Sequence, residues 1–301
     1  MLTQVLVTLL AGGMFAGAFA VGRTAFLRRL LGRSARPSIY PPIPSFWRSI
    51  LQSQVPLTRR LTPAQRERLL QKMQQLIHGC RWEGCAGLRL TEDMQVVIAA
   101  HACLLVLEQP GDPYPDLDTV LIYPGTFRPR RFSWTPSADS GDDDPALGES
   151  WKHGVVILAW DSTLAGAADP RDGQNVVLHE FAHQLDMASG QADGTPRLPN
   201  ATALSSWSAM LERDFERLSR EAEAGSQGVL DHYGATNPAE FFAVATEAFF
   251  ERPAELQRER PVLYDALRDY YRQDLAATAA SGETASSTSA PDMGLPPDVR
   301  S

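Results

Sequence analysis

The sequence has few cysteines and no excess of basic residues. Its three cysteines, Cys80, Cys85 and Cys103, are an odd number, and no second closely spaced pair complements Cys80 and Cys85. This scarcity argues against a disulfide-rich framework and against a four-cysteine metal site, and it suits a reducing compartment. The formal net charge of -8 argues against binding to nucleic acid phosphates, so we expect no direct nucleic-acid binding.

Charged residues are absent between Leu2 and Gly22, and this segment is long enough to form a transmembrane helix. Arginines follow from Arg23 to Arg36, and no acidic residue precedes Glu67. By the positive-inside rule, the remainder of the chain then faces the cytoplasm. We therefore predict an inner-membrane anchor at residues 1–22. The alternatives are a cleaved signal peptide, a buried or peripheral helix, and a cytoplasmic protein.

Composition divides the rest of the chain into three parts. Residues 23–58 are basic and rich in proline, which predicts an extended connector that leads to a helix start. Residues 59–275 contain the periodic apolar segments and are expected to fold as one globular domain. Residues 276–301 are rich in Ser, Thr, Ala and Pro, which predicts a disordered tail.

Capping residues and apolar patterns predict the elements of this domain. Thr62 caps a helix that continues to about His78, and Thr91 caps a second helix that ends near Leu107. His101, inside the second helix, is expected to be a core histidine. The other expected elements are strands at residues 119–123 and 154–160, a turn after the second strand, and helices at residues 205–223, 238–250 and 261–275. The prediction is an α+β fold, mostly helical with a small mixed β-sheet, preceded by the N-terminal apolar helix.

Residues 176–186 read VVLHEFAHQLD and place two histidines four positions apart in an apolar run. On a helix, His179 and His183 lie on one face about one turn apart, so both imidazoles can reach one ion. Glu180 points about 100° away from His179, where it can act on a water held by that ion. The alternative is an ordinary helix with two core or surface histidines. A third ligand would decide between them.

Catalytic zinc takes three protein ligands and keeps one position for water. No further histidine occurs in residues 184–195, so a glutamate from a later helix is the remaining source. Glu240 and Glu247 lie on one face of the predicted helix but about 10 Å apart along its axis, so only one of them can bind the ion. We favour Glu240, in the first turn, and give Glu247 a supporting or structural part. The alternative for Glu240 is an acid that stabilises the helix N-terminus.

A longer set of residues extends these motifs: His179-Glu-Phe-Ala-His183-Gln-Leu-Asp186-Met, Gly190, Asp193-Gly194, Pro196, Tyr233 and Asn237-Pro-Ala-Glu240-Phe-Phe-Ala-Val. From about residue 43 to residue 275 the chain resembles the MtfA (Mlc titration factor A) family of bacterial zinc peptidases. The resemblance implies His179, His183 and Glu240 as ligands of one zinc ion, Glu180 as general base and Tyr233 as a transition-state stabiliser. It also implies a gluzincin-type fold similar to the catalytic domain of anthrax lethal factor. Family members are soluble, so the N-terminal apolar segment is a departure.

Three further positions have open interpretations. Asp186, three residues after His183, is expected to hydrogen-bond a ligand histidine, and the alternative is a helix-surface or capping acid. His232, beside Tyr233, is a competing candidate ligand. Tyr233 itself has an alternative as a packed loop aromatic.

Two functions remain open at this stage. The first is a zinc-dependent peptidase in which Glu180 is the general base for a metal-activated water. The second is a non-catalytic regulatory protein in which zinc organises a binding surface. The resemblance implies a peptide or protein substrate and, as a further partner, a transcriptional repressor of the Mlc type. Glu180 favours the peptidase, because binding alone would not require this carboxylate.

Overall fold

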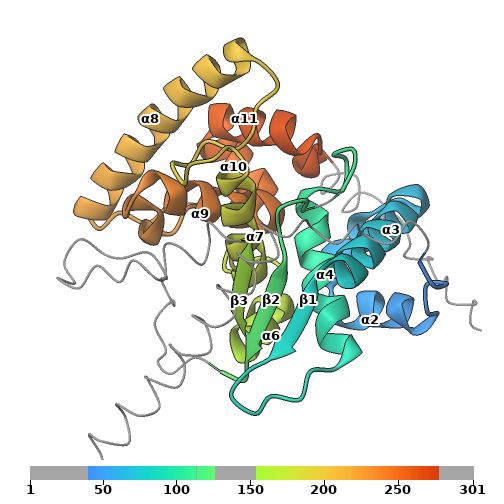
Figure 1. Cartoon of the computed structure of the whole chain (residues 1–301). Helices are drawn as coiled ribbons and strands as arrows, with labels where there is room; N and C mark the ends of the chain where they lie inside the picture. The colour runs from blue at the N-terminus through green and yellow to red at the C-terminus, as the bar shows by residue number, and fades with distance from the viewer. Residues whose placement is uncertain (1–39, 113, 126–153, 278–301) are drawn as a thin grey trace, which may run out of the picture.

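The computed structural model describes residues 40–112, 114–125 and 154–277 (Figure 1). The predicted membrane anchor at residues 1–22 lies outside these ranges, as do residues 23–39 of the predicted connector and residues 278–301 of the predicted tail. Within the described ranges, no helix combines the length and the apolar character needed to cross a membrane.

The described strands form one small parallel sheet in the order β1-β2-β3, made of β1 (Arg81–Gly84), β2 (Thr119–Tyr123) and β3 (Val155–Ala159). Thr119 of β2 pairs with Arg81 on one side and with Val155 on the other. The chain passes from β1 to β2 through helix α4 (Glu92–Leu105), the kind of crossover that parallel strands require. The prediction of a mixed sheet is therefore wrong for the described strands, whereas the mostly helical α+β fold is confirmed.

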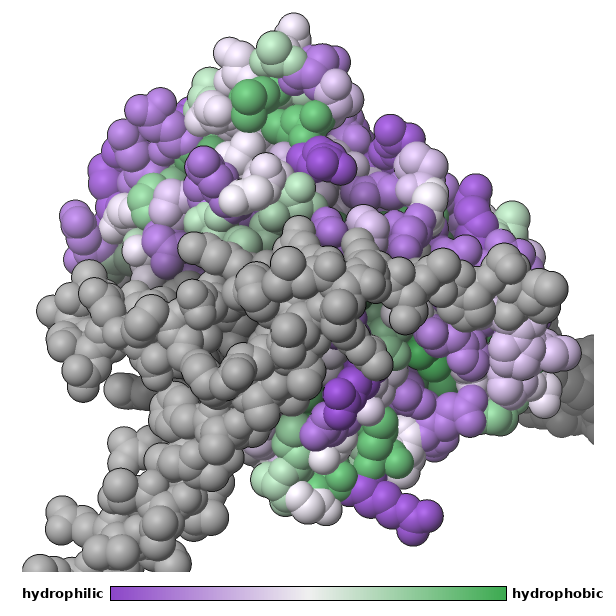
Figure 2. Space-filling model, viewed as in Figure 1, coloured by the Kyte–Doolittle hydropathy of each residue, from purple (hydrophilic) through white to green (hydrophobic). Residues whose placement is uncertain are grey.

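Most of the other described helices lie in two groups around this sheet (Figure 1). The first group lies beside β1 and contains α2 (Phe46–Gln54), η1 (Pro56–Arg60) and α3 (Pro63–Gly79). The second group lies above the sheet in this view and contains α8 (Ala201–Glu223), η2 (His232–Ala235), α9 (Pro238–Glu251), α10 (Pro253–Glu259) and α11 (Pro261–Tyr271). Next to β3 lie α6 (Trp160–Ala168) and α7 (Val176–Met187). Hydrophilic residues follow the outer side of α8 (Figure 2).

Two helices form the centre of the core. Every residue of α4 from Val96 to Leu105 is buried, and so is every residue of α9 from Ala239 to Glu251. His101 is the predicted core histidine: its Nδ1 lies 2.9 Å from the Val97 carbonyl oxygen. Helix α7 packs against α4, α6, α9 and β3, so contacts on several sides fix its position.

The predicted helix starts at Thr62 and Thr91 are confirmed. The Thr62 side chain accepts a hydrogen bond from the Gln65 amide and completes a capping box, and Thr91 accepts one from the Met94 amide. The last predicted helix ends earlier than expected, at Tyr271, because Arg272 takes a left-handed conformation with φ of 57°.

Helices α2, α6 and α10 occupy segments for which the sequence predicted none. Helix α2 lies in the predicted extended connector, and that prediction is wrong for its residues because Trp47, Ile50 and Leu51 pack into the core. The Trp47 indole also donates a hydrogen bond of 2.8 Å to Glu92 on α4. Helix α6 replaces most of the predicted turn after β3. Its small residues permit close packing, since a Cβ on Gly166 would lie 2.9 Å from the Gln174 carbonyl oxygen.

The burial of Trp47 predicts that α2 stabilises the whole domain. Trp47→Ala should lower the free energy of unfolding by about 3–5 kcal/mol, because it removes a buried aromatic side chain and leaves a cavity. Phe46→Ala is the matched control: Phe46 precedes Trp47 on the same helix but is 40% exposed, and its loss should cost less than about 1 kcal/mol. Chemical denaturation measures both changes. Equal effects of the two substitutions would show that α2 is not part of the cooperative unit.

Candidate metal centre

Helix α7 presents its two histidines on the side that faces α9. Asn175 caps the start of the helix: its side chain accepts a hydrogen bond of 3.2 Å from the Leu178 amide. Leu178, Phe181 and Ala182 are buried in the core, which fixes the rotation of the helix. The rings of His179 and His183 then lie side by side, with centroids 4.9 Å apart and planes at 81°.

Helix α9 brings Glu240 to these histidines from 61 residues further along the chain. Asn237 caps α9 by accepting a hydrogen bond from the Glu240 amide, and Pro238 occupies the first helical position. Glu240 Oε2 lies 3.0 Å from His179 Nε2 and 3.6 Å from His183 Nε2. The two Nε2 atoms are 3.2 Å apart.

These three atoms fit one small divalent cation. Four ligands at the ~2.0–2.1 Å typical of zinc would be about 3.3 Å from one another in a tetrahedron. The observed separations of 3.0, 3.2 and 3.6 Å agree with that value. His179, His183 and Glu240 accordingly form a group that can hold a metal ion. Three protein ligands would leave one tetrahedral position open, as catalytic sites require.

Charge is distributed unequally among the acids of this site. Burial alone would raise the pKa of Glu240, but hydrogen bonds from His179 and His183 outweigh it and hold that pKa far below its usual value. Burial raises the pKa of Glu180 to about 8; the neighbouring Glu240 and Glu247 add to this shift and His179 opposes it. Glu240 is therefore ionised at neutral pH, while the two protonation states of Glu180 are close in energy there.

Glu247 lies two turns after Glu240 and contacts the other side of His179. Its Oε1 is 2.8 Å from His179 Nδ1, and its Oε2 accepts a hydrogen bond from the Asn175 amide. One carboxylate therefore holds both the start of α7 and the ring of His179. Burial alone would lower the pKa of His179, but its hydrogen bonds with Glu240 and Glu247 outweigh burial and raise that pKa well above its usual value.

Glu251 is a supporting residue that sequence reasoning missed. Its Oε2 accepts hydrogen bonds from the amides of Gly173, at 3.0 Å, and Gln174, at 3.1 Å, and its Oε1 accepts one of 3.0 Å from the Asn175 side chain. The available signal was the four-residue spacing from Glu247, which puts both carboxylates on one face of α9.

Tyr233 lies on η2, near His179. Its ring centroid is 6.1 Å from that of His179. The next residue, Gly234, holds η2 against α8 and α9, because a Cβ there would lie 3.0 Å from a methyl group of Leu218 and 3.2 Å from Cβ of Val244. This close packing of Gly234 against α8 and α9 fixes the backbone next to Tyr233.

Asp186 and His232 each form a hydrogen bond with a backbone group. Asp186 is fully buried, and its Oδ2 accepts a hydrogen bond of 2.8 Å from the Gly194 amide. Burial raises the pKa of Asp186 to about 6, although the Gly194 bond and the charge of His183 oppose this shift. His232 Nε2 lies 2.7 Å from the Ser226 carbonyl oxygen, and His232 is not in the group that can hold a metal.

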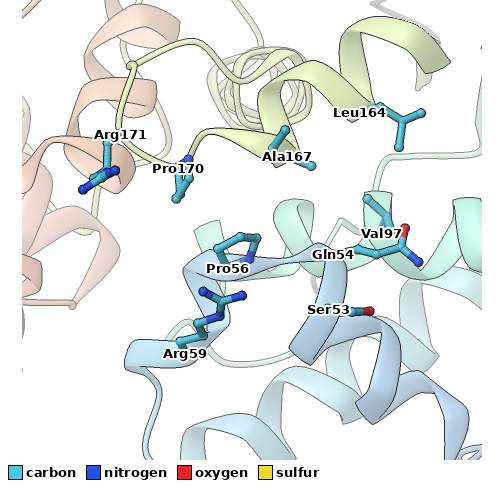
Figure 3. A pocket seen from close by; sticks show the side chains of 10 residues that line it. Ser53, Gln54, Pro56, Arg59, Val97, Leu164, Ala167, Pro170 and Arg171 are labelled. Carbon is cyan, nitrogen blue, oxygen red and sulfur yellow. The ribbon is translucent and has the colours of Figure 1, made fainter.

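A cavity of about 670 Å³ lies elsewhere, between α2, η1 and α6 (Figure 3). Pro56, Val97 and Ala167 are among its lining residues, with Arg59 and Arg171 at its edge. None of the predicted site residues lines it.

Comparison with known proteins agrees with this geometry. A family model described as "Glucose-regulated metallo-peptidase M90" matches residues 32–272. The chain is 40% identical over 232 residues to the uncharacterized protein slr2042 of Synechocystis sp., covering 76% of this chain and 84% of that protein. It is 32% identical over 227 residues to the Mlc titration factor A of Serratia proteamaculans, covering 73% and 84% of the two chains. A Mlc titration factor A of Yersinia pestis is 32% identical over 232 residues, covering 73% and 82%. The chain therefore belongs to the MtfA family, a family of metallopeptidases.

Proposed function

We propose that this protein is a zinc-dependent peptidase of gluzincin type that hydrolyses peptide bonds in a peptide or protein substrate. The observation that carries the proposal is the convergence of His179, His183 and Glu240 to mutual distances of 3.0–3.6 Å. A buried carboxylate, Glu180, adjoins this group in the sequence and interacts electrostatically with His179 and Glu240.

The donor set favours zinc. Two imidazole nitrogens and one carboxylate oxygen, with a fourth position left open, are the usual ligands of catalytic zinc. When bound, zinc acts as a Lewis acid that makes water a competent nucleophile at neutral pH. Glu247 holds His179 through Nδ1, so Nε2 would be the atom of this residue that binds the ion.

Glu180 moves the proton in both halves of the reaction. It takes a proton from the attacking water while the water oxygen bonds to the peptide carbonyl carbon. It then gives this proton to the departing amine as the carbon–nitrogen bond breaks. A carboxyl whose pKa is raised to about 8 by burial suits this double role, because its two protonation states are close in energy near neutral pH.

Tyr233 stabilises the negative charge that develops on the carbonyl oxygen. Its phenol hydroxyl can donate a hydrogen bond to that oxygen, and the ring lies beside His179. The packing of Gly234 against α8 and α9 limits the movement of the tyrosine. Such a fixed donor contributes more to the transition state than to substrate binding.

A regulatory role is the second candidate. Two of the relatives carry the name Mlc titration factor A, which favours a transcriptional repressor of the Mlc type as a partner of this chain. Under this regulatory hypothesis, zinc organises a surface that binds the partner, and the protein hydrolyses no peptide bond. The buried Glu180 favours the peptidase, since a surface role gives no reason to bury an acid beside the ligands.

We also propose that residues 1–22 anchor the protein in the inner membrane, with a connector after them and the peptidase domain in the cytoplasm. Support comes from the uncharged segment Leu2 to Gly22 and the arginines that follow it. A cytoplasmic protein is the alternative. The domain itself begins before residue 59, because Trp47 belongs to its core.

Metal content and turnover separate the two functions. Wild-type protein should contain one zinc per chain and cleave an unfolded protein substrate. Glu180→Gln should keep the zinc and lose about 10²–10⁴-fold in kcat, because the general base is removed. Elemental analysis and a fluorescent peptide assay measure these quantities, and Glu212→Gln, at an exposed site on α8, is the control. Full turnover in a zinc-loaded Glu180→Gln would refute the mechanism, and zinc-loaded wild type without turnover would favour the binding protein.

Removal of a single hydroxyl tests the role of Tyr233. Tyr233→Phe should lower kcat by about 10²–10³-fold, as expected for loss of one oxyanion donor. KM should stay within about threefold, because the donor acts in the transition state. Tyr40→Phe removes a hydroxyl from the first described residue and should leave both constants unchanged. A rise in KM with constant kcat would instead assign Tyr233 to substrate binding.

Cell fractionation tests the anchor. The full-length protein should sediment with membranes and be released by detergent but not by high salt, because apolar burial rather than charge holds it. A form without residues 1–22 should be soluble and keep its turnover. Full-length protein found wholly in the soluble fraction would contradict the anchor.

A further inference from the structure

Gly194 lies where three helices meet, in the segment between α7 and α8. Its φ is +76°, which favours glycine, and the residue is buried. A Cβ at this position would lie 2.3 Å from the carbonyl oxygen of Pro238 and 2.8 Å from its carbonyl carbon. Only a hydrogen atom fits between this segment and the first turn of α9.

Two hydrogen bonds join Gly194 to α7 and α8. Its amide donates to Asp186 Oδ2 on α7 at 2.8 Å, and its carbonyl accepts from the Trp207 indole on α8 at 2.9 Å. Both of its backbone polar groups are therefore satisfied although they are buried. One residue thus joins the end of α7, the start of α9 and the side of α8.

This junction lies close in sequence to two of the ligands. Asp186 follows His183 by three residues, and Pro238 precedes Glu240 by two. His183 and Glu240 meet close to this junction, with 3.6 Å between His183 Nε2 and Glu240 Oε2. Relief of a 2.3 Å contact to the ordinary 3.4 Å would move the backbone of α9 by roughly 1 Å, more than the ~0.5 Å that a metal site tolerates.

The other end of the α7–α9 contact is held independently. There, Glu247 bonds to His179 and the Asn175 amide, and Glu251 bonds to the Asn175 side chain. We therefore expect a change at Gly194 to leave the position of His179 intact and to displace Glu240 relative to His183.

We propose that Gly194 is a positioning residue of the metal centre, which sets the spacing of Glu240 and His183 through the contact with Pro238 and the bonds to Asp186 and Trp207. This inference rests on the proposed function, since it requires a metal ion at His179, His183 and Glu240.

Gly194→Ala and Gly190→Ala form a matched pair for the test. Both residues have positive φ in the same segment, but a Cβ on Gly190, where φ is +104°, would meet nothing within 4 Å. The two substitutions therefore share backbone strain and differ in the contact with α9. The measurement is the zinc affinity of the purified full-length protein in competition with a chromophoric chelator, together with the Tm of the metal-free protein.

Gly194→Ala should bind zinc about 10–100-fold more weakly than wild type, as loss of a support to metal ligands does, while Gly190→Ala should stay within about twofold. A purely structural role would lower the metal-free Tm but leave the zinc affinity of the folded protein unchanged, and that result would overturn the proposal. Wild type that binds no zinc would refute the proposed function itself.

If Gly194→Ala does not fold, Trp207→Phe replaces it: loss of the indole donor should weaken zinc binding by about three- to tenfold, and unchanged affinity would overturn the proposal.

Discussion

The contact between α7 and α9 determines whether this protein has a metal centre. Two imidazoles on α7 become ligands of one ion only when Glu240 arrives from 61 residues away at 3.0 Å from His179. The apolar residues of both helices bring them together, since α9 is buried on every side from Ala239 to Glu251. Hydrophobic burial thus supplies the energy that assembles a group of polar side chains.

This arrangement buries three acidic residues of α9, and each of their carboxyl groups has polar partners that offset part of the cost of burial. Glu240 contacts both histidines, Glu247 contacts His179 and the Asn175 amide, and Glu251 accepts three hydrogen bonds from residues 173–175. Buried carboxylates without such partners would cost several kcal/mol each. Burial raises the pKa of Glu180 and of Glu251 to about 8, but of these two only Glu180 lies next to His179 in the sequence. Carboxyl groups in different environments thereby have different pKa values, which would allow one to bind a metal ion and another to carry a proton.

Local patterns predicted the parts of the site but not their relative placement. The four-residue spacing of His179 and His183 needs only a helix, and the capping asparagines Asn175 and Asn237 fix where α7 and α9 begin. Whether Glu240 or Glu247 meets Nε2 of His179 depends on how far one helix is shifted along the other. That shift is set by tertiary contacts, which neither segment encodes alone. Helix α2 was not predicted because it is a short amphipathic segment between prolines, which indicated an extended connector. Helix α6 was not predicted because its small residues favour a helix only where a neighbouring segment packs closely against them.

An anomalous difference map at the zinc absorption edge, from crystals of the zinc-loaded protein, tests the central claim most directly. One peak should appear at ~2.0–2.2 Å from Nε2 of His179, Nε2 of His183 and a carboxylate oxygen of Glu240. A zinc peak at Glu247 or His232 instead of Glu240, or no peak between the two imidazoles, would contradict the account.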